Sequence, residues 1–202
     1  AQGVVILSAA PMGLLRKELI DTFGRDVARR LLLRFGYADG YHDAVNLRDR
    51  SSWSDPVEGL RAGATLHTLE GIVRARVARV SYVPDGLFEA EYIWEASYEA
   101  EQHAHHYGPA SEPVCWSLVG YASGYASACL GREVYFRERE CLGKGDPHCV
   151  VTGRDAAGWG SEIETFRADF QSAGLRDEVE RVQEAVRKRA QDLARRERVL
   201  ER

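Results

Sequence analysis

Three cysteines and one glutamate in the second half of the chain carry the clearest chemical signal. Cys141 and Cys149 are separated by a loop with two glycines and a proline, which lets the chain fold back so that both sulfurs face one point. Glu138 lies three residues before Cys141, a spacing that converges if the chain turns there, and Cys115 would arrive from the preceding apolar segment. Three thiolates and one carboxylate would form a closed tetrahedral zinc site, which is the structural kind.

Spacing alone leaves alternatives to this set of ligands. Three buried cysteines without a metal would give the same pattern, and His148 is a rival for the fourth position. The four ligands carry four negative charges against two on the ion, so the site needs nearby donors or cations. Arg137 and Arg139 flank Glu138 and are the candidates. Cys129 lies among small residues and is expected to be an ordinary core residue.

A histidine and a tryptophan form the second candidate pair. His67 lies just before the first strand of a predicted hairpin, and Trp94 is the last residue of the second strand. A turn at Pro84-Asp85-Gly86 would bring both to the same end. An imidazole and an indole N–H could jointly bind a hydroxyl in an apolar cavity, where burial without partners would cost roughly a few kcal/mol. Taken singly, each residue is more usually part of an ordinary core. His103 and His105 lie two residues apart, so they would share one face of an extended segment and could form a metal pair. A solvated loop is the simpler interpretation.

Composition and missing motifs limit the class of protein. The chain has 202 residues, is 45% hydrophobic and carries a net charge of -4, which indicates one globular domain with an appendage and no nucleic-acid surface. No apolar run approaches the length of a membrane span. There is no P-loop, GxGxxG, GxSxG or HExxH motif, and no assembled catalytic set. Four clustered cysteines indicate metal binding in a reducing compartment rather than a disulfide scaffold.

The elements that must position these residues follow an α+β pattern. Apolar residues at helical spacing predict a helix over residues 12–35, with a break near Gly24 and an end at Gly36 and Gly40. The remaining expected elements are a strand over 4–7, helical stretches over 40–51 and 57–62, a hairpin between 66 and 94, a polar loop over 95–110, an apolar helix over 113–130, and short strands over 134–137 and 149–151.

The last part of the chain has a different pattern. Residues 161–202 place apolar side chains at spacings of three and four among many charges, which predicts a coiled-coil-like helix. Arg189 and Arg196 occupy seam positions and weaken that pattern, so a solvated terminal helix is the alternative. The chain begins without methionine and ends inside this helical pattern, as expected of a piece of a longer protein.

Several motifs together resemble one family, the sensor domains of XylR/DmpR-type activators of aromatic catabolism. They are residues 16–20 followed by Gly36-Tyr37, then 112–116, 120–125, and 138–141 with Cys149. The resemblance covers nearly the whole chain. It implies a zinc-binding V4R-type sensor domain over 1–160 and a helical linker over 161–202. We expect a homodimer with the N-terminal segment and the terminal helix at the interface. The linker would lead to an absent AAA+ ATPase domain of a sigma-54-dependent, cytoplasmic regulator.

The resemblance also implies roles for particular residues. It implies that Cys115, Glu138, Cys141 and Cys149 hold structural zinc beside the effector pocket, as the spacing suggests. His67 and Trp94 would bind the hydroxyl of a phenol, as in the phenol-responsive branch. The implied pocket-wall positions are Leu60, Tyr92, Tyr125 and Phe136.

Two wall positions depart from the phenol-sensor pattern. Leu60 stands where phenylalanine is expected, and Phe136 where tyrosine is expected. The pocket should therefore be roomier or more apolar, which leaves substituted phenols and larger aromatics open. The resemblance implies that this fragment is not itself an enzyme and contacts neither nucleic acid nor membrane. The rival functions are a V4R-related enzyme, and a redox sensor in which Cys141 and Cys149 oxidise and release zinc.

Overall fold

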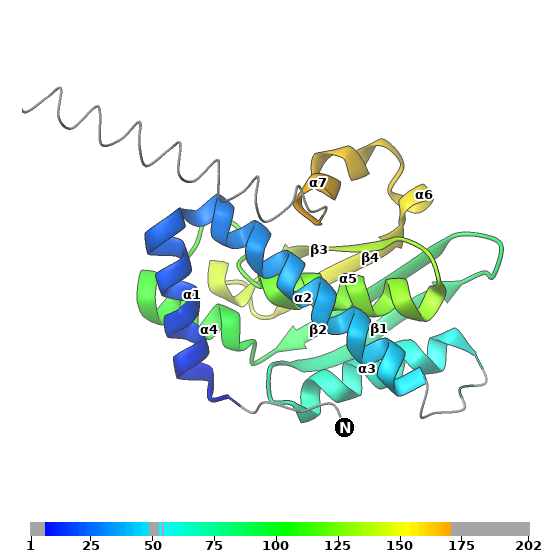
Figure 1. Cartoon of the computed structure of the whole chain (residues 1–202), viewed down its shortest axis with the longest axis horizontal. Helices are drawn as coiled ribbons and strands as arrows, with labels where there is room; N and C mark the ends of the chain where they lie inside the picture. Colours follow the sequence, from blue (N-terminus) through cyan, green and yellow to red (C-terminus); the bar gives the residue numbers. More distant parts are fainter. Residues whose placement is uncertain (1–6, 49–52, 54, 171–202) are drawn as a thin grey trace, which may run out of the picture. The chain divides into compact units, whose positions relative to one another are not determined.

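The computed structural model describes residues 7–48, 53 and 55–170 (Figure 1). Within them, helices and a four-stranded sheet form an α+β fold, as predicted. The strand expected over 4–7 falls outside these residues except for Leu7, which is not in a strand, and the coiled-coil-like stretch beyond 170 lies outside them entirely. Among the described residues, no helix has the length and apolar character needed to cross a membrane.

Two helices begin the described part of the chain. α1 (Ala9–Phe23) and α2 (Arg25–Arg48) are separated at Gly24, where the break is predicted. Gly24 has a φ of 84°, which favours glycine. The expected end at Gly36 and Gly40 is wrong, because α2 continues through both glycines to its last residue.

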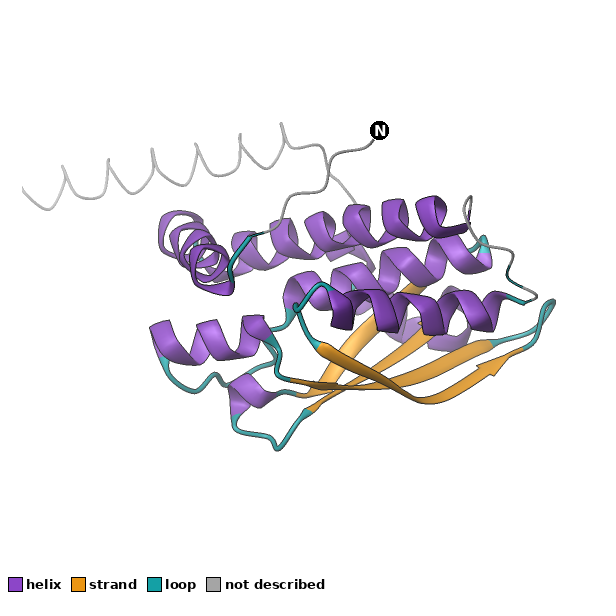
Figure 2. Ribbon diagram, turned by 90° about the horizontal axis from the view of Figure 1, so that it is seen from below, coloured by secondary structure: helices purple, strands orange, loops and turns teal. Residues whose placement is uncertain are grey.

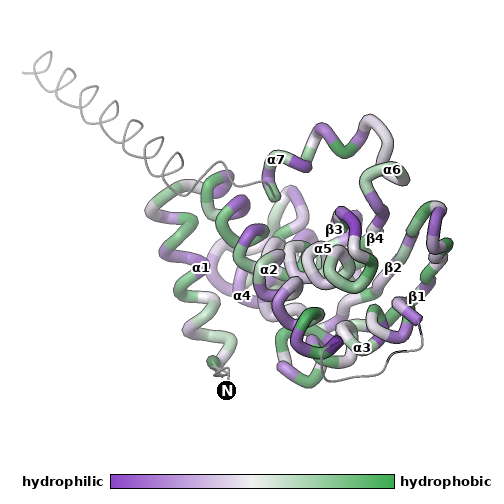
Figure 3. The backbone as a smooth tube through the Cα atoms, turned by 45° about the vertical axis from the view of Figure 1, so that its right-hand side comes forward, coloured by the Kyte–Doolittle hydropathy of each residue, from purple (hydrophilic) through white to green (hydrophobic). Residues whose placement is uncertain are grey.

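The glycines of α2 serve close packing against α5 (Trp116–Leu130), the predicted apolar helix. A Cβ added at Gly36 would lie 2.0 Å from the carbonyl oxygen of Ser117, and one at Gly120 would lie 2.1 Å from a carbonyl oxygen of α2. No side chain fits at such distances, so glycines on both helices bring the two backbones together. As a result, α5 is enclosed between α2 and the sheet (Figures 1 and 3).

The sheet consists of the strands β1 (Arg74–Tyr82), β2 (Phe88–Glu95), β3 (Val134–Glu140) and β4 (Cys149–Asp155). These four antiparallel strands lie in the order β1-β2-β4-β3. The predicted turn at Pro84-Asp85-Gly86 joins the first two strands, and the Gly86 N–H donates to the carbonyl of Val83. Figure 2 shows the long helices stacked on one side of the sheet.

The two faces of the sheet differ in character. Alternate residues of β2, from Phe88 to Trp94, are buried under the helices. The opposite face carries ion pairs such as Arg79–Glu89. Trp159 and nearby apolar residues pack there against Tyr135 of β3. The short elements near β4 are η1 (Leu142–Lys144), α6 (Ala156–Trp159), η2 (Gly160–Thr165) and α7 (Arg167–Phe170).

α3 (Pro56–Leu69) is longer than the helix predicted over 57–62. The carboxylate of Asp55 caps its start by accepting from the backbone N–H groups of Val57 and Glu58. The sequence predicts that residues 66–69 begin the hairpin, but they form the last turn of α3. This places His67 on a helix rather than at the threshold of a strand.

α4 (Tyr98–Tyr107) replaces the loop predicted over 95–110. The Ser97 hydroxyl caps it by accepting from the Ala100 N–H, and Glu99 in its first turn is fully buried. The polar composition concealed this helix because its inward face contains ionisable side chains rather than an apolar stripe.

The histidines of α4 do not form the metal pair that extended spacing would allow. His103 is buried and His105 is exposed, since residues two apart on a helix point in different directions. Burial, followed by the nearby cations Arg16 and Arg25, lowers the pKa of His103 to about 4.

Candidate metal cluster and ligand cavity

The four predicted metal ligands come together on the inner face of the sheet. The ligand atoms of Cys115, Glu138, Cys141 and Cys149 all lie within 4.8 Å of one another. The Cys115 sulfur is 3.9 Å from that of Cys141 and 3.8 Å from that of Cys149. Three segments supply them: the residue before α5, the β3 end with its turn, and the start of β4. In the described part of the chain no other group of three or more such side chains could hold a metal ion, and His148 does not belong to this one.

The chemistry of these four groups fits a bound cation. All three cysteines are fully buried, and burial followed by the neighbouring Cys141 raises the pKa of Glu138 to about 8. The Oε1 atom of Glu138 is buried and has no hydrogen-bond partner among the described residues. Such a set of buried anionic ligands needs a positive partner. Three thiolates with one carboxylate at tetrahedral spacing suit zinc.

The prediction that two arginines compensate the negative charge of the four ligands is wrong. Arg137 lies 3.9 Å from Glu162, and Arg139 donates to Glu91 at 2.6 Å. Successive side chains of a strand point to opposite faces, so the two arginines that flank Glu138 point away from it.

Backbone amides and one hydroxyl contact the cluster instead. The Cys115 N–H donates to Glu138 Oε2 at 3.1 Å, and the Leu142 N–H donates to the Cys149 sulfur at 3.3 Å. The Ser97 hydroxyl lies 3.1 Å from the Cys115 sulfur. These contacts orient the ligand atoms without adding a charged side chain.

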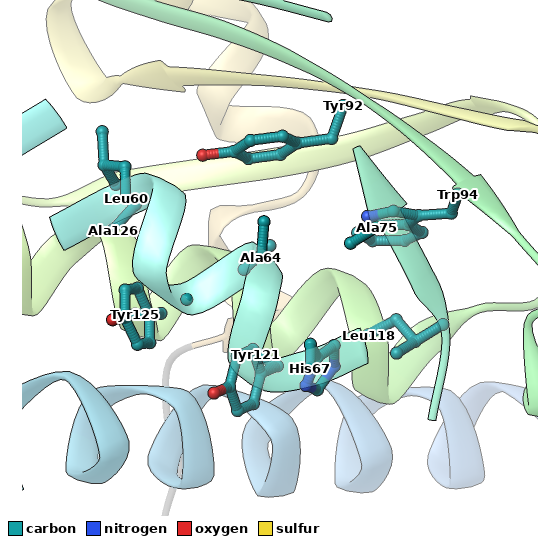
Figure 4. Close-up of a pocket in the computed structure, with 12 residues that line it drawn as sticks. Leu60, Ala64, His67, Ala75, Tyr92, Trp94, Leu118, Tyr121, Tyr125 and Ala126 are labelled. Atoms are coloured by element: carbon teal, nitrogen blue, oxygen red, sulfur yellow. The ribbon is translucent and has the colours of Figure 1, made fainter. Parts of the chain in front are cut away.

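A cavity of about 30 Å³ lies between α3, α5 and the first two strands, and Figure 4 shows the side chains around it. Five of the six predicted ligand-binding residues line it: Leu60, His67, Tyr92, Trp94 and Tyr125. The sixth, Phe136, is not among the lining residues. Its ring stacks on Tyr92 at 5.4 Å between centroids and so supports the wall from behind.

The sequence prediction missed the rest of the cavity wall. Tyr121 and Leu118 line it from α5, at helical spacing from Tyr125, which is the signal that could have found them. The remaining lining residues are small, namely Gly63, Ala64, Ala75, Ala122 and Ala126.

His67 supplies an unsatisfied polar atom in this apolar enclosure. Its Nδ1 lies 3.2 Å from Glu70 Oε2, and its ring stacks on Tyr121 with centroids 3.7 Å apart. The other ring nitrogen, Nε2, is buried and has no hydrogen-bond partner among the described residues. Native structures rarely leave such an atom unpaired, and the hydroxyl of Tyr125, which also lines the cavity, is likewise buried without a partner among the described residues.

Known proteins match the chain along nearly its whole length. A family described as an activator of aromatic catabolism matches residues 1–82, and the V4R domain matches residues 94–154. The chain is 34% identical over 186 residues to the transcriptional regulatory protein XylR of Pseudomonas putida, covering 92% of this chain and 33% of that protein. It is 32% identical over 166 residues to the phenol regulator MopR of Acinetobacter guillouiae, covering 81% of this chain and 30% of MopR. The chain thus spans about a third of the length of these relatives.

A solved structure decides the assignment. The crystal structure of the phenol-responsive sensory domain of the transcription activator PoxR with phenol matches with a TM-score of 0.80 and 38% identity, over 85% of both chains. This chain belongs to the sensory domains of XylR-type activators of aromatic catabolism. The resemblance inferred from the sequence motifs is therefore confirmed, and the relatives are transcriptional or phenol regulators by name.

In this XylR-type sensory domain the cavity joins the two matched regions. Leu60 and His67 belong to the first region, whereas Trp94 and Tyr125 belong to the V4R region. All four residues of the metal cluster lie in the V4R region. Trp94 is also the direct cross-strand neighbour of Cys149, so the cavity and the metal cluster share a strand pair.

Proposed function

We propose that this chain is the effector-binding domain of a transcriptional activator and that it binds phenol or a substituted phenol in the cavity. The observation that carries the proposal is that His67, whose Nε2 is buried without a partner among the described residues, lines a cavity whose walls are otherwise mainly apolar and aromatic. A phenol hydroxyl would donate to this nitrogen and accept from the indole N–H of Trp94. Its ring would contact the aromatic walls.

The wall composition supports a substituted ring. Leu60 has less bulk than an aromatic side chain, and Phe136 behind Tyr92 brings no hydroxyl. Both changes favour apolar substituents at these two positions, whereas the hydroxyl of Tyr125 on another wall is buried without a partner among the described residues.

Replacing His67 with alanine should weaken phenol binding by about tenfold, since a net hydrogen bond of ~1.4 kcal/mol corresponds to that factor. Calorimetry on both chains measures the change directly, and an equal affinity would show that His67 does not anchor the hydroxyl.

A thermal-shift screen of phenol, cresols, catechol, hydroxybiphenyl, benzene and toluene would rank the effectors, because a bound ligand stabilises the folded chain by mass action. No shift with any of the phenols would contradict the proposal.

We propose that the metal cluster holds structural zinc. When bound, zinc would join the segment before α5 to the loop between β3 and β4, and α5 carries Tyr121 and Tyr125 of the cavity wall. The cluster therefore supports the shape of the cavity, while His67, Trp94 and the walls discriminate among ligands.

The proposal extends to the domains and to self-association. We assign residues 1–160 to the sensor and 161–202 to a linker towards an ATPase domain of a longer protein. Ligand binding would release that ATPase domain from repression.

Exposed apolar side chains on α1 support a homodimer formed through the N-terminal segment. They are Leu14, Leu15 and Phe23, which are 52%, 53% and 40% exposed. Sedimentation velocity should show a dimer, and a monomer at micromolar concentration would contradict it.

A further inference from the structure

We propose that the effector enters the cavity between α3 and β1, through a gate formed by Ala64 and Ala75, and that the hydroxyl of Thr68 holds this gate closed. The inference rests on the proposed function, because it concerns the route by which a phenol would reach the cavity. It adds an entry site and a residue that controls the rate of binding.

The first step is the enclosure of the cavity. Its volume of about 30 Å³ leaves room for about one or two water molecules, so an aromatic ring can enter only if the surrounding elements move apart. Three of the lining residues, Ala64, Ala75 and Ala122, are half-buried, and all the others are buried. Ala122 belongs to α5, which is enclosed between α2 and the sheet (Figure 1). The thinnest part of the wall is therefore at Ala64 and Ala75.

The second step is a groove on the other side of these two alanines. An open groove of about 390 Å³ lies between α3 and β1, and it is lined by Arg61 and Thr65 of the helix and by residues 76–80 of the strand. Ala64 and Ala75 line this groove as well as the cavity, and no other described residue lines both. Figure 4 shows the two alanines among the side chains around the cavity. Their methyl groups are small, so a modest separation of α3 from β1 would join the groove to the cavity.

The third step is the contact that holds the two alanines together. The Thr68 hydroxyl donates to the carbonyl of Ala64 at 2.9 Å and accepts from the N–H of Ala75 at 3.0 Å. One hydroxyl therefore bridges the backbones of both gate residues. Thr68 is itself exposed and lines neither the cavity nor the groove. Because a hydrogen bond at an exposed position contributes little net free energy, this bridge can hold the gate closed and still open often.

The fourth step is the ability of β1 to move. It lies at the edge of the sheet and pairs only with β2, and its register shifts between Val77 and Arg79, which both line the groove. A shift of this kind interrupts the ladder of hydrogen bonds. Every residue of β1 is exposed or half-buried, so a displacement of the strand disturbs little packing.

Stopped-flow fluorescence with phenol as the ligand tests the gate. In the unmodified chain the association rate constant should lie well below the diffusional ceiling of about 10⁸ M⁻¹s⁻¹, because the gate must open before the ring enters. Thr68→Val keeps the shape of the side chain and removes the bridge between Ala64 and Ala75. It should raise the association and dissociation rate constants by the same factor, about threefold or more, so that their ratio changes much less than either.

A second variant tests the same route from the groove. Thr65→Phe adds bulk at an exposed residue that lines the groove and not the cavity, and it should slow both rate constants by about threefold or more. Thr165→Val is the matched control for Thr68→Val, since it removes an exposed hydroxyl that donates to the nearby Glu162 carbonyl, and it should change neither rate constant.

Two results would overturn the gate. One is unchanged rate constants in Thr68→Val. The other is a change in the dissociation rate constant alone, because Thr68 would then act on the bound state and not on entry. If neither phenol nor the cresols bind to the unmodified chain, the proposed function fails instead.

Discussion

Replacing Cys149 with serine is expected to remove the metal from the chain and to lower the midpoint of thermal unfolding by about 10 °C or more. The expectation follows from the burial of the cluster, since Cys115, Cys141 and Cys149 are all fully buried and close to Glu138. Losing one ligand leaves the other three as buried groups without their cation. It also frees the loop between β3 and β4 from the segment before α5.

The measurement combines elemental analysis with thermal unfolding. The unmodified chain should contain about one zinc ion, as expected for a closed four-ligand site, and a chelator should reproduce the loss of stability seen in Cys149→Ser. Cys129→Ala is the matched control, because Cys129 is half-buried on α5 and outside the cluster, so that variant should keep its metal. The cysteines would form an ordinary core if the unmodified chain took up no zinc and a chelator left its unfolding temperature unchanged.

The sequence predicted best where the signal was local. Cys141, Cys149 and Glu138 lie within a few residues of one turn, and the glycines between them make their convergence a short-range matter. The hairpin between β1 and β2 was predicted for the same reason, from its turn residues and alternating strands.

Other features depend on contacts that no local pattern records. The sequence predicts a helix end at Gly36 because glycine usually disfavours a helix, yet contact with the α5 backbone makes glycine the residue required there. The sequence predicts His67 just before a strand, although α3 continues past it to Leu69. Its predicted proximity to Trp94 was nevertheless correct, since Ala75 of β1 is the direct partner of Trp94 and lines the same cavity as His67.

The buried ion pair between Arg16 and Glu99 gave no signal in the sequence, because its members are 83 residues apart and one lies in a segment predicted to be a loop. Arg16 Nη1 donates to Glu99 Oε1 at 3.0 Å, and Nη2 donates to the Val114 carbonyl at 2.9 Å. The guanidinium also lies 3.9 Å above the Trp116 ring. The other oxygen of Glu99 accepts from the Leu118 N–H at 3.1 Å. The pair thus joins α1 and α4 to the start of α5, next to the metal cluster.

Arg16→Met should lower the free energy of unfolding by about 3–5 kcal/mol, because it leaves Glu99 buried without its cation. The double variant Arg16→Met/Glu99→Gln should recover most of that loss, since it removes both charges and keeps the shape. Urea unfolding of the single variants and the double variant gives the coupling energy, and purely additive losses would show that the pair is not a unit.

The pH dependence of the stability of Arg16→Met provides a second test of the ion pair. Burial already raises the pKa of Glu99 despite the opposing effect of Arg16. Removing the arginine should raise it further, so the folded variant holds a proton that the unfolded chain releases. Its stability should then fall as the pH rises from the ordinary range of a glutamic acid through the raised value. The double variant has no ionisable group at position 99 and should lack this fall, which separates loss of the charge partner from loss of packing alone.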